Sequence, residues 1–257
     1  MYVCTGLSAR GDDVCDVGQR GAAAGVGGAR HFLQNDAAIV IIVDLDKQKG
    51  ARALETIKSK YGDRKTAFYK CDVTTDLDSV FDEVINRYGC VDLLINNAGV
   101  LLEKDFRRTI DVNITAVIAW SMKFHDIMRT DRGGRGGTII NVSSVCGYKV
   151  SPYMPYYHAS KFAVLGFSRS LGHKVNFDRT GVRVIALCPG LTVSTMSTVN
   201  VHIKDDEYLD EFLEEVKKEP WQTADNIGRG AVTIYQLAES GDAWLVEGER
   251  PAVKLSI

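Results

Sequence analysis

The sequence predicts an α/β fold in which helices cover both faces of a doubly wound parallel sheet. Apolar runs alternate along the chain with polar stretches of helical periodicity, which is the pattern of repeated strand–helix units. Residues 39–43 are all β-branched, which is typical of a strand buried on both faces. The length of 257 residues suits one large domain and no Pro/Ser-rich linker divides the chain, so we expect a single domain over residues 1–257.

The other elements follow from the same two periods. Helical spacing is clear over residues 76–88, where Leu77, Val80 and Val84 recur on one face. After the strand at 39–43 we expect, in order, helix 47–61, strand 67–69, helix 76–88, strand 91–95, helix 106–128, strand 138–142, helix 156–175, strand 182–187, helices 205–217 and 223–239, and strand 243–246.

The first strand has two candidate positions. Residues 12–20 directly precede a glycine cluster, but they contain Asp12, Asp13 and Asp16, and burying three carboxylates would be costly. Residues 1–6 are more strand-like and end in Thr-Gly, but they leave about fourteen residues before Gly21. The sequence leaves both positions open.

Composition excludes several classes of function. The net charge of −2 gives no electrostatic basis for binding nucleic acid or an anionic membrane. The chain lacks any run of roughly 18 apolar residues, so we expect no membrane span. The first residues lack the apolar core of a signal peptide. Six cysteines are scattered without C-x-x-C spacing, so we expect reduced thiols, no metal site and a cytoplasmic protein.

A glycine cluster at Gly21, Gly25 and Gly27 precedes a helix-like stretch at residues 29–33. Glycines allow a pyrophosphate to approach the backbone closely at a helix N-terminus. Asp44 ends the next strand, where a carboxylate would hydrogen-bond the ribose hydroxyls of a dinucleotide. A glycine cluster alone also fits a flexible loop, but cluster, helix, strand and Asp44 together predict dinucleotide binding.

Tyr157 and Lys161 lie four residues apart on one face of a predicted helix. A free tyrosine has a pKa near 10, and a neighbouring ammonium group favours the phenolate, so the pair can provide a proton acceptor. By itself this spacing usually marks two surface residues. Ser144, however, follows a predicted strand at the edge where ligands bind in parallel sheets, and its hydroxyl could polarise a carbonyl oxygen. Ser143 and Ser144 could also simply cap a turn.

The chain resembles the short-chain dehydrogenase/reductase family over nearly its whole length. The motifs that carry the resemblance are Gly21-x-x-x-Gly25-x-Gly27, Asp44, Cys71-Asp72-Val73, Asn96-Asn97-Ala98-Gly99, Asp111-Val112-Asn113, Asn141-Val142-Ser143-Ser144, Tyr157-x-x-x-Lys161 and Pro189-Gly190. The tail at residues 243–248 looks more like the branch that contains 15-hydroxyprostaglandin dehydrogenase and insect alcohol dehydrogenase. The resemblance implies a Rossmann-type domain and an enzyme that transfers a hydride between NAD and an alcohol or ketone.

The resemblance also implies a role for each matching residue. Tyr157 would be the acid/base, Lys161 would lower its pKa and hold the nicotinamide ribose, and Ser144 would orient the substrate oxygen. Asn113 would kink its helix and anchor a water that relays protons to Lys161. Contacts with NAD would come from Gly21, Gly25, Gly27, Asp44, Asp72, Val73, Asn97, Ala98, Gly99, Tyr157, Lys161, Pro189, Gly190, Thr192 and Ser194.

Some residues depart from the family pattern. Arg20 stands where the family has a threonine, residues 12–20 are acidic, and the segment from Gly27 to Asp44 is about one residue short. These departures put the affinity for the cofactor in question. They also keep open an alternative, a non-catalytic family member that binds or stores a ligand.

Substrate and assembly are less constrained. Met154, Tyr153, Met196 and Phe212 suggest an apolar pocket and a lipophilic secondary alcohol or ketone, although all four could be ordinary core or surface residues. Trp120, Phe124, Phe162, Leu165 and Phe167 make residues 106–128 and 156–175 rich in apolar side chains. Some of these belong to the core, but the resemblance implies a helical interface there, so we expect a homodimer or homotetramer.

Overall fold

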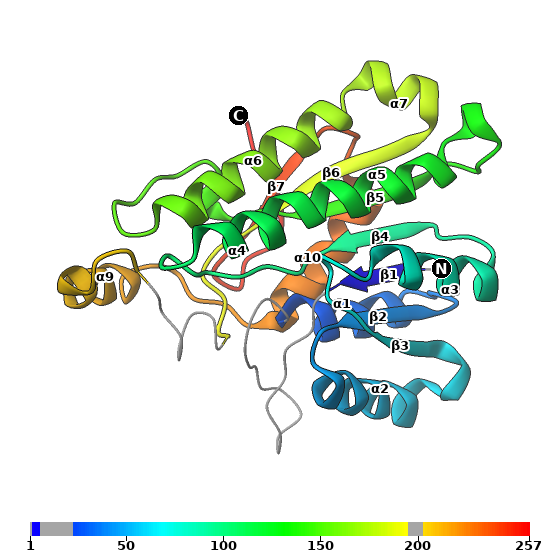
Figure 1. The fold of residues 1–257 in the computed structure, drawn as a ribbon, viewed down its shortest axis with the longest axis horizontal. Helices are drawn as coiled ribbons and strands as arrows, with labels where there is room; N and C mark the ends of the chain where they lie inside the picture. Colours follow the sequence, from blue (N-terminus) through cyan, green and yellow to red (C-terminus); the bar gives the residue numbers. More distant parts are fainter. Residues whose placement is uncertain (1, 6–22, 195–202) are drawn as a thin grey trace.

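The computed structural model describes residues 2–5, 23–194 and 203–257, with backbone alone for residues 2–5 and 23–27. The described strands form one eight-stranded sheet in the order β3-β2-β1-β4-β5-β6-β7-β8 (Figure 1). Every neighbouring pair is parallel except β7 with β8, which is antiparallel. The strands are β1 Tyr2–Thr5, β2 Val40–Asp44, β3 Thr66–Lys70, β4 Leu93–Asn96, β5 Gly137–Val142, β6 Val182–Pro189, β7 Ala243–Val246 and β8 Val253–Lys254.

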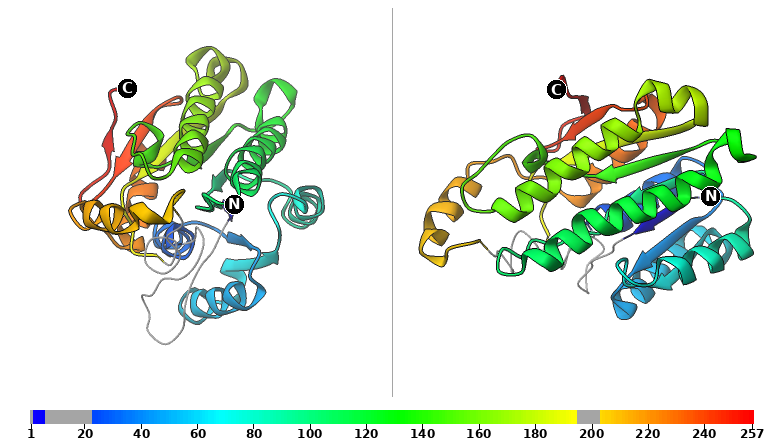
Figure 2. Two further views of the ribbon diagram at one scale, coloured as in Figure 1. Left: turned by 60° about the vertical axis from the view of Figure 1, so that its left-hand side comes forward. Right: turned by 45° about the horizontal axis from the view of Figure 1, so that its top comes forward.

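Helices cover both faces of this sheet, so the predicted fold class is confirmed (Figure 2). One face packs against α1 Ala23–Gln34, α2 Lys47–Tyr61 and α10 Ala224–Leu237. The other packs against α3 Leu77–Tyr88, α5 Val117–Met128 and α6 Pro155–Leu171. The shorter helices are α4 Phe106–Ile110, α7 Lys174–Thr180 and α9 Leu209–Val216.

The continuous apolar strands contribute side chains to the cores on both faces of the sheet. In β2, Ile42 points into the core under α1, α2 and α10, whereas its neighbours Ile41 and Val43 point into the core under α3 and α5. Because successive side chains of a strand point to opposite faces, a strand buried on both sides needs no polar alternation. All five residues of β2 are buried, as the β-branched run predicts.

Of the two candidate first strands, residues 2–5 form β1 in the structure. This strand lies between β2 and β4, with Val3 opposite Ile41 on one side and Leu94 on the other. The competing segment, residues 12–20, lies outside the described residues. The strand order reverses at β1 and β4, and the carboxyl ends of strands at such a switch point form the ligand crevice of open α/β sheets.

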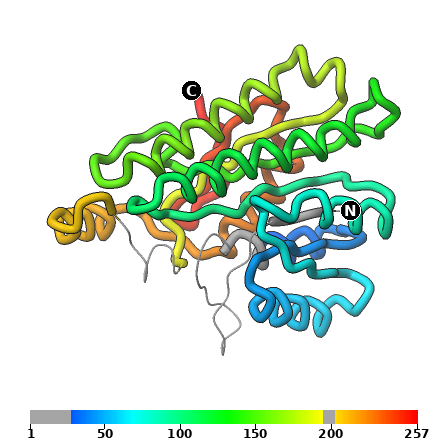
Figure 3. The backbone as a smooth tube through the Cα atoms, in the orientation of Figure 1, coloured from blue at the N-terminus to red at the C-terminus, as the bar shows by residue number. Residues whose placement is uncertain are grey.

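The long helix expected over 106–128 is continuous but irregular. Between α4 and α5 the residues Asp111–Ala116 form a π-helical segment, and the tube in Figure 3 shows the three pieces as one green rod. Single-turn π segments occur frequently at functional sites. The predicted kink at Asn113 therefore takes the form of a wider helical turn around that residue.

The helix expected over 156–175 ends earlier. α6 stops at Leu171, and α7 starts at Lys174 after an extended residue, His173. A Cβ on Gly172 would collide with the backbone of Val184 and Gly241, so the chain can approach β6 and the loop before β7 only with glycine here. β8 was not expected, because it is two exposed residues long and has no apolar pattern.

Candidate active site

The predicted site residues gather at one edge of the sheet. Asp44 ends β2, Asp72 and Val73 follow β3, Asn97–Gly99 follow β4, Ser143 and Ser144 follow β5, and Pro189 ends β6. Since these strands are parallel, all their carboxyl ends lie at the same edge. Residues far apart in the sequence are therefore brought together by topology alone.

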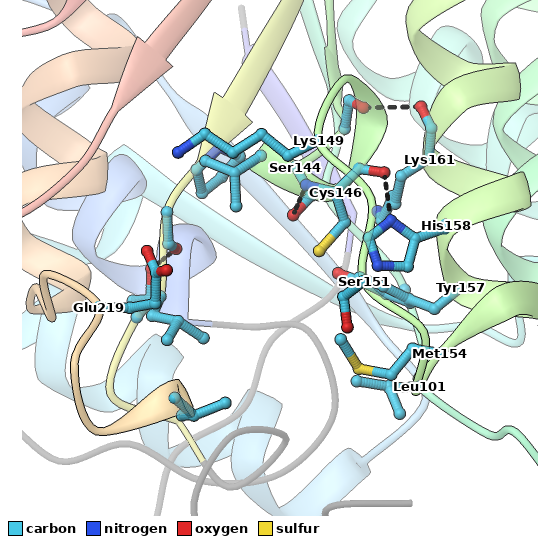
Figure 4. Close-up of a pocket in the computed structure, with 18 of the residues that line it drawn as sticks. Leu101, Ser144, Cys146, Lys149, Ser151, Met154, Tyr157, His158, Lys161 and Glu219 are labelled. Atoms are coloured by element: carbon cyan, nitrogen blue, oxygen red, sulfur yellow. Dashed lines mark hydrogen bonds between the residues drawn. The ribbon is translucent and has the colours of Figure 1, made fainter. Parts of the chain in front are cut away.

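A cavity of about 330 Å³ opens at this edge (Figure 4). Several predicted residues line it together: Asn97, Gly99, Ser144, Tyr157, Lys161, Pro189, Gly190, Thr192 and Ser194. Asp44, Asp72, Val73, Ala98 and Asn113 lie outside its lining within the described chain. The predicted catalytic residues, with the exception of Asn113, thus share one cavity.

The glycine cluster is described only in part. α1 begins at Ala23, earlier than the expected start at residue 29, so Gly25 and Gly27 lie in the first turns of the helix. Gly21 lies outside the described residues.

Lys161 is held in place at the bottom of the cavity. Its side chain is buried, and its ammonium nitrogen donates a 3.0 Å hydrogen bond to the carbonyl of Val142 at the end of β5. The same nitrogen lies 5.5 Å from the centre of the Tyr157 ring, which is partly buried one helical turn earlier on α6. The expected proximity of the two side chains is present.

In the protein without a ligand, burial is the largest influence on the pKa of Tyr157 and on that of Lys161. Burial raises the pKa of Tyr157 well above its usual value. The neighbouring Cys146 raises this pKa further, whereas a hydrogen bond with Ser144 lowers it. Burial also lowers the pKa of Lys161 to about 8. Desolvation of the phenolate therefore sets the net direction of the Tyr157 pKa in the protein by itself, and the expectation that Lys161 lowers this pKa stays a prediction.

The structure separates the two adjacent serines. Ser143 is buried, and its hydroxyl donates its only proton to the carbonyl of Lys161 at 2.8 Å, so this residue fixes α6 against β5. The hydroxyl oxygen of Ser144 accepts a 3.1 Å hydrogen bond from the backbone N–H of Cys146. Both serines line the cavity, and the Ser144 hydroxyl also interacts with the Tyr157 phenol, so the choice of Ser144 over Ser143 stays a prediction.

Asn113 is fully buried behind the cavity. Its amide oxygen accepts from the N–H of Val100 at 2.8 Å, and its amide nitrogen donates to the Val100 carbonyl at 2.8 Å and to the Ser160 hydroxyl at 3.0 Å. A Cβ on Gly99 would lie 3.5 Å from the Asn113 oxygen and 3.6 Å from the Lys161 ammonium nitrogen. Asn113, Lys161 and Gly99 therefore converge on one point.

The acidic residues predicted to hold the adenosine end already have partners in the protein. One oxygen of the buried Asp44 carboxylate accepts from the N–H of Asp46 at 2.6 Å. The Asp72 carboxylate accepts from the Thr74 hydroxyl at 2.6 Å and from the Arg108 guanidinium at 2.9 Å. These bonds orient both carboxylates.

Sequence reasoning missed three residues around the cavity. Gln222 is buried and donates to the Val246 carbonyl at 2.7 Å, while its backbone forms a bridge with Thr192 that fixes the chain after β6. His158 lines the cavity, and its Nδ1 lies 3.1 Å from the Cys146 carbonyl. Glu103 is buried and accepts from the N–H groups of Tyr156 and Tyr157. None of the three belongs to a periodic pattern or a motif, so the sequence carried no signal for them.

Burial raises the pKa of the Glu103 carboxyl, and the two N–H groups of Tyr157 and Tyr156 oppose this shift. Across the described ranges, no group of His, Cys, Asp and Glu side chains is arranged to hold a metal ion. In the same ranges, no helix is both long and apolar enough to cross a membrane.

Comparisons with known proteins agree with this architecture. The family model described as short chain dehydrogenase matches residues 20–205. The chain is 33% identical over 224 residues to "15-hydroxyprostaglandin dehydrogenase [NAD(+)]" of Homo sapiens, covering 84% of each chain. It is 31% identical over 256 residues to "Alcohol dehydrogenase 1" of Ceratitis capitata, covering 98% of each.

Solved structures show the same fold. Levodione reductase superposes with a TM-score of 0.76 at 20% identity, covering 96% of this chain and 95% of that one. The 3-ketoacyl-(acyl-carrier-protein) reductase of Brucella melitensis, complexed with NADH, gives 0.74 at 23% identity and covers 96% of each chain. Together with the family model over 20–205, these matches confirm the resemblance in the sequence: the chain belongs to the short-chain dehydrogenase family of oxidoreductases.

Proposed function

We propose that this protein is an NAD-dependent oxidoreductase that moves a hydride between nicotinamide and a secondary alcohol or ketone, with Tyr157 as the acid/base. One observation carries the proposal. Ser144 follows β5, Tyr157 and Lys161 lie on α6, and all three line the same cavity at the carboxyl edge of the sheet. Two relatives have NAD(+) or alcohol dehydrogenase in their names, which supports the same class of reaction.

The residues around the cavity fit a dinucleotide. Lys161 has N–H donors beyond its bond to Val142, suited to the ribose hydroxyls of a nicotinamide. Thr192 and Ser194 line the same cavity and would lie beside the carboxamide. Asn97–Gly99, Pro189 and Gly190 would lie along the cofactor, and Asp72 and Val73 would face its adenine. Gly21, Gly25 and Gly27 would cradle its pyrophosphate, and Asp44 would bind the adenosine ribose hydroxyls.

Each protein group has a defined task in alcohol oxidation. NAD, when bound, would supply the hydride acceptor. Tyr157 would accept the proton from the alcohol oxygen. The hydrogen on the alcohol carbon would leave as a hydride, with both electrons of the broken C–H bond. Ser144 donates its hydroxyl proton to the same oxygen and holds it in place. Lys161, fixed by its bond to Val142, would favour the phenolate through the positive charge of its ammonium group.

Part of the cavity wall is apolar and favours a lipophilic substrate. Leu101, Met154, Phe212 and Val216 line the cavity, and the same residues belong to one apolar cluster with Tyr153 and Tyr157. Met196, which the sequence assigned to this wall, lies outside the described residues. The apolar wall would bind the hydrocarbon part of the substrate, and Ser144 and Tyr157 would bind its single reacting oxygen.

The predicted interface residues divide into two groups. Trp120, Phe124 and Leu165 are buried in the core, so they cannot form an interface. On α6, Phe162 is 43% exposed and Phe167 is half-buried. Ile118 and Met122 are 36% and 39% exposed on α5, which lies beside α6 (Figures 1 and 2). We propose that these exposed side chains form the contact of a symmetric homodimer, or of a homotetramer, of a cytoplasmic enzyme.

The alternative, a non-catalytic binding protein, is tested by the same experiment. The protein is incubated with NAD and a series of secondary alcohols of increasing chain length, and NADH formation is followed by absorbance. Turnover that improves with chain length supports the proposal. Binding of NADH without turnover of any alcohol or ketone in the series would favour the non-catalytic function.

A further inference from the structure

The first N–H groups of α6 have their hydrogen-bond acceptors outside the helix. A helix leaves its first N–H groups without partners inside the helix. Here Pro155 has no N–H, and the preceding residue, Met154, makes no side-chain capping bond. The N–H of His158 bonds to the Met154 carbonyl at 2.9 Å. Two N–H groups therefore need a partner from elsewhere, and they belong to Tyr156 and Tyr157.

Glu103 satisfies both of them. One carboxylate oxygen accepts from the N–H of Tyr157 at 2.7 Å, and the other accepts from the N–H of Tyr156 at 3.1 Å. The Glu103 side chain comes from the loop between β4 and α4, more than fifty residues away in the sequence. It is 2% exposed, and a negative charge at a helix N-terminus is favourable. Glu103 thus caps α6 from outside the helix.

The loop that carries Glu103 is itself fixed. Its residue Val100 is bonded through both its N–H and its carbonyl to the side chain of Asn113. The carbonyl of Leu102 accepts from the hydroxyl of Thr109 at 3.0 Å. Because the loop is tied to α4 and to the π segment, the Glu103 carboxylate has a fixed position from which to hold α6.

The backbone carbonyl of Tyr157 is also linked by hydrogen bonds to Asn113. The hydroxyl of Ser160 donates to the Tyr157 carbonyl at 2.7 Å and accepts from the Asn113 amide at 3.0 Å. Both peptide groups of Tyr157 are therefore held by bonds that lead back to Asn113, through Ser160 on one side and through Val100 and Glu103 on the other. The Cα that carries the phenol lies between these two peptide groups.

We infer that Glu103 is a positioning residue for Tyr157: its carboxylate sets the position of the phenol relative to Ser144 and Lys161. This inference rests on the proposed role of Tyr157 as the acid/base. A displacement of about 1 Å at a reacting group can lower a rate about 10²-fold. Removal of Glu103 therefore acts on the chemical step, whereas a residue that only stabilised the fold would change stability alone.

The test compares three variants in the full-length protein. Glu103→Ala removes both acceptors, and Glu103→Gln keeps one acceptor but turns an NH₂ group toward the other N–H. Lys104→Ala is the matched control, because Lys104 is the next residue on the same loop and its exposed side chain pairs only on the surface with Asp206. For each we measure kcat and KM for NAD and a secondary alcohol, the pH profile of kcat, NADH binding by fluorescence, and thermal unfolding.

The expected result is a graded loss of kcat. Glu103→Ala lowers kcat about 10- to 100-fold, Glu103→Gln lowers it less, and both move the pH midpoint of oxidation upward while the KM for NAD and the NADH affinity stay near wild type. Lys104→Ala behaves as wild type. If Glu103→Ala fails to fold, the kcat and pH midpoint of Glu103→Gln decide alone.

Two results would overturn the inference about Glu103. A separate result, with Tyr157→Phe, would show that the proposed function itself is wrong. Glu103 variants that unfold at lower temperature but keep the wild-type kcat and pH midpoint would show a purely structural cap. An equal loss in Lys104→Ala would show a general effect of the loop. If Tyr157→Phe itself retains turnover, the proposed function fails, and the positioning role of Glu103 fails with it.

Discussion

The ammonium nitrogen of Lys161 lies 5.5 Å from the centre of the Tyr157 ring, and both groups lie at the bottom of one cavity. Burial opposes the charged form of each, since it raises the pKa of Tyr157 and lowers that of Lys161 to about 8. Near neutral pH the phenol is uncharged whether the protein is folded or not, so only the buried ammonium group of Lys161 lowers the stability of the protein alone. Catalytic groups in such sites are often maintained at the expense of stability.

Replacing Lys161 tests this directly. A lysine whose pKa falls from 10.5 to about 8 on folding destabilises the fold while it is charged. The penalty is fully present below pH 8 and disappears as the pH rises to 10.5, so wild-type stability should rise over that interval. The shift corresponds to about 3 kcal/mol at pH 7. Lys161→Met should lose turnover yet be at least as stable as wild type at pH 7, by denaturant unfolding.

Unfolding of wild type and Lys161→Met measured at several pH values can also contradict this prediction. In Lys161→Met the rise in stability between pH 8 and 10.5 should be absent. A variant that is less stable than wild type at pH 7 would show that the 3.0 Å bond to Val142 outweighs desolvation.

The two serines at the end of β5 should respond differently to replacement by alanine. Ser144→Ala removes the donor to the substrate oxygen and should lower kcat, but less than Tyr157→Phe, because the proton acceptor remains. Ser143→Ala breaks the buried bond to the Lys161 carbonyl, so it should lower the free energy of unfolding by about 1 kcal/mol. Steady-state kinetics and denaturant unfolding of both variants check the division. Equal effects of the two substitutions on kcat would contradict it.

Cofactor choice should depend on Asp44. Its buried carboxylate ends β2, and a negative charge there repels the additional phosphate of NADP. We expect kcat/KM to be higher with NAD than with NADP, and Asp44→Ser to raise the ratio of NADP to NAD activity by about tenfold or more. Asp46→Ser is a suitable control, since Asp46 caps the following helix. Wild-type turnover that is equal or better with NADP would exclude this role.

Assembly should depend on exposed rather than buried apolar residues. Phe162→Glu and Met122→Glu place charges on the exposed faces of α6 and α5, so they should dissociate the oligomer without unfolding it. Val150→Glu, at the most exposed of the large apolar residues in the described chain, is the control. Sedimentation at micromolar concentration checks the mass of each. A wild-type protein that sediments as a monomer would rule out the interface.

The sequence predicted the sheet well because its strands are buried on both faces. The β-branched run at residues 39–43 favours a central strand, and the structure places residues 40–43 of it in β2 between β1 and β3. The first strand could not be chosen from sequence, since residues 1–6 and 12–20 each satisfy one local criterion. Parallel pairing of Val3 with both Ile41 and Leu94 is a long-range contact that local patterns do not contain.

Site residues within motifs were predictable, and those outside them were not. Ser144, Tyr157 and Lys161 belong to motifs that the sequence displays, and the structure brings all three to one cavity, while their catalytic roles stay predictions. Glu103 and Gln222 act through bonds to backbone groups, which any sequence possesses, so nothing in the chain marks them. The direction of the Tyr157 pKa was also beyond sequence, because burial is a property of the folded cavity.

The central claim, that Tyr157 is the acid/base, is tested most directly by Tyr157→Phe, which removes one hydroxyl and keeps the ring. The account predicts that kcat for NAD-dependent oxidation of a secondary alcohol falls roughly 10²-fold or more, because general acid–base catalysis contributes about that much. NADH affinity, measured by fluorescence titration, should stay at the wild-type value. A Tyr157→Phe protein that binds NADH normally and keeps near wild-type kcat would contradict the account.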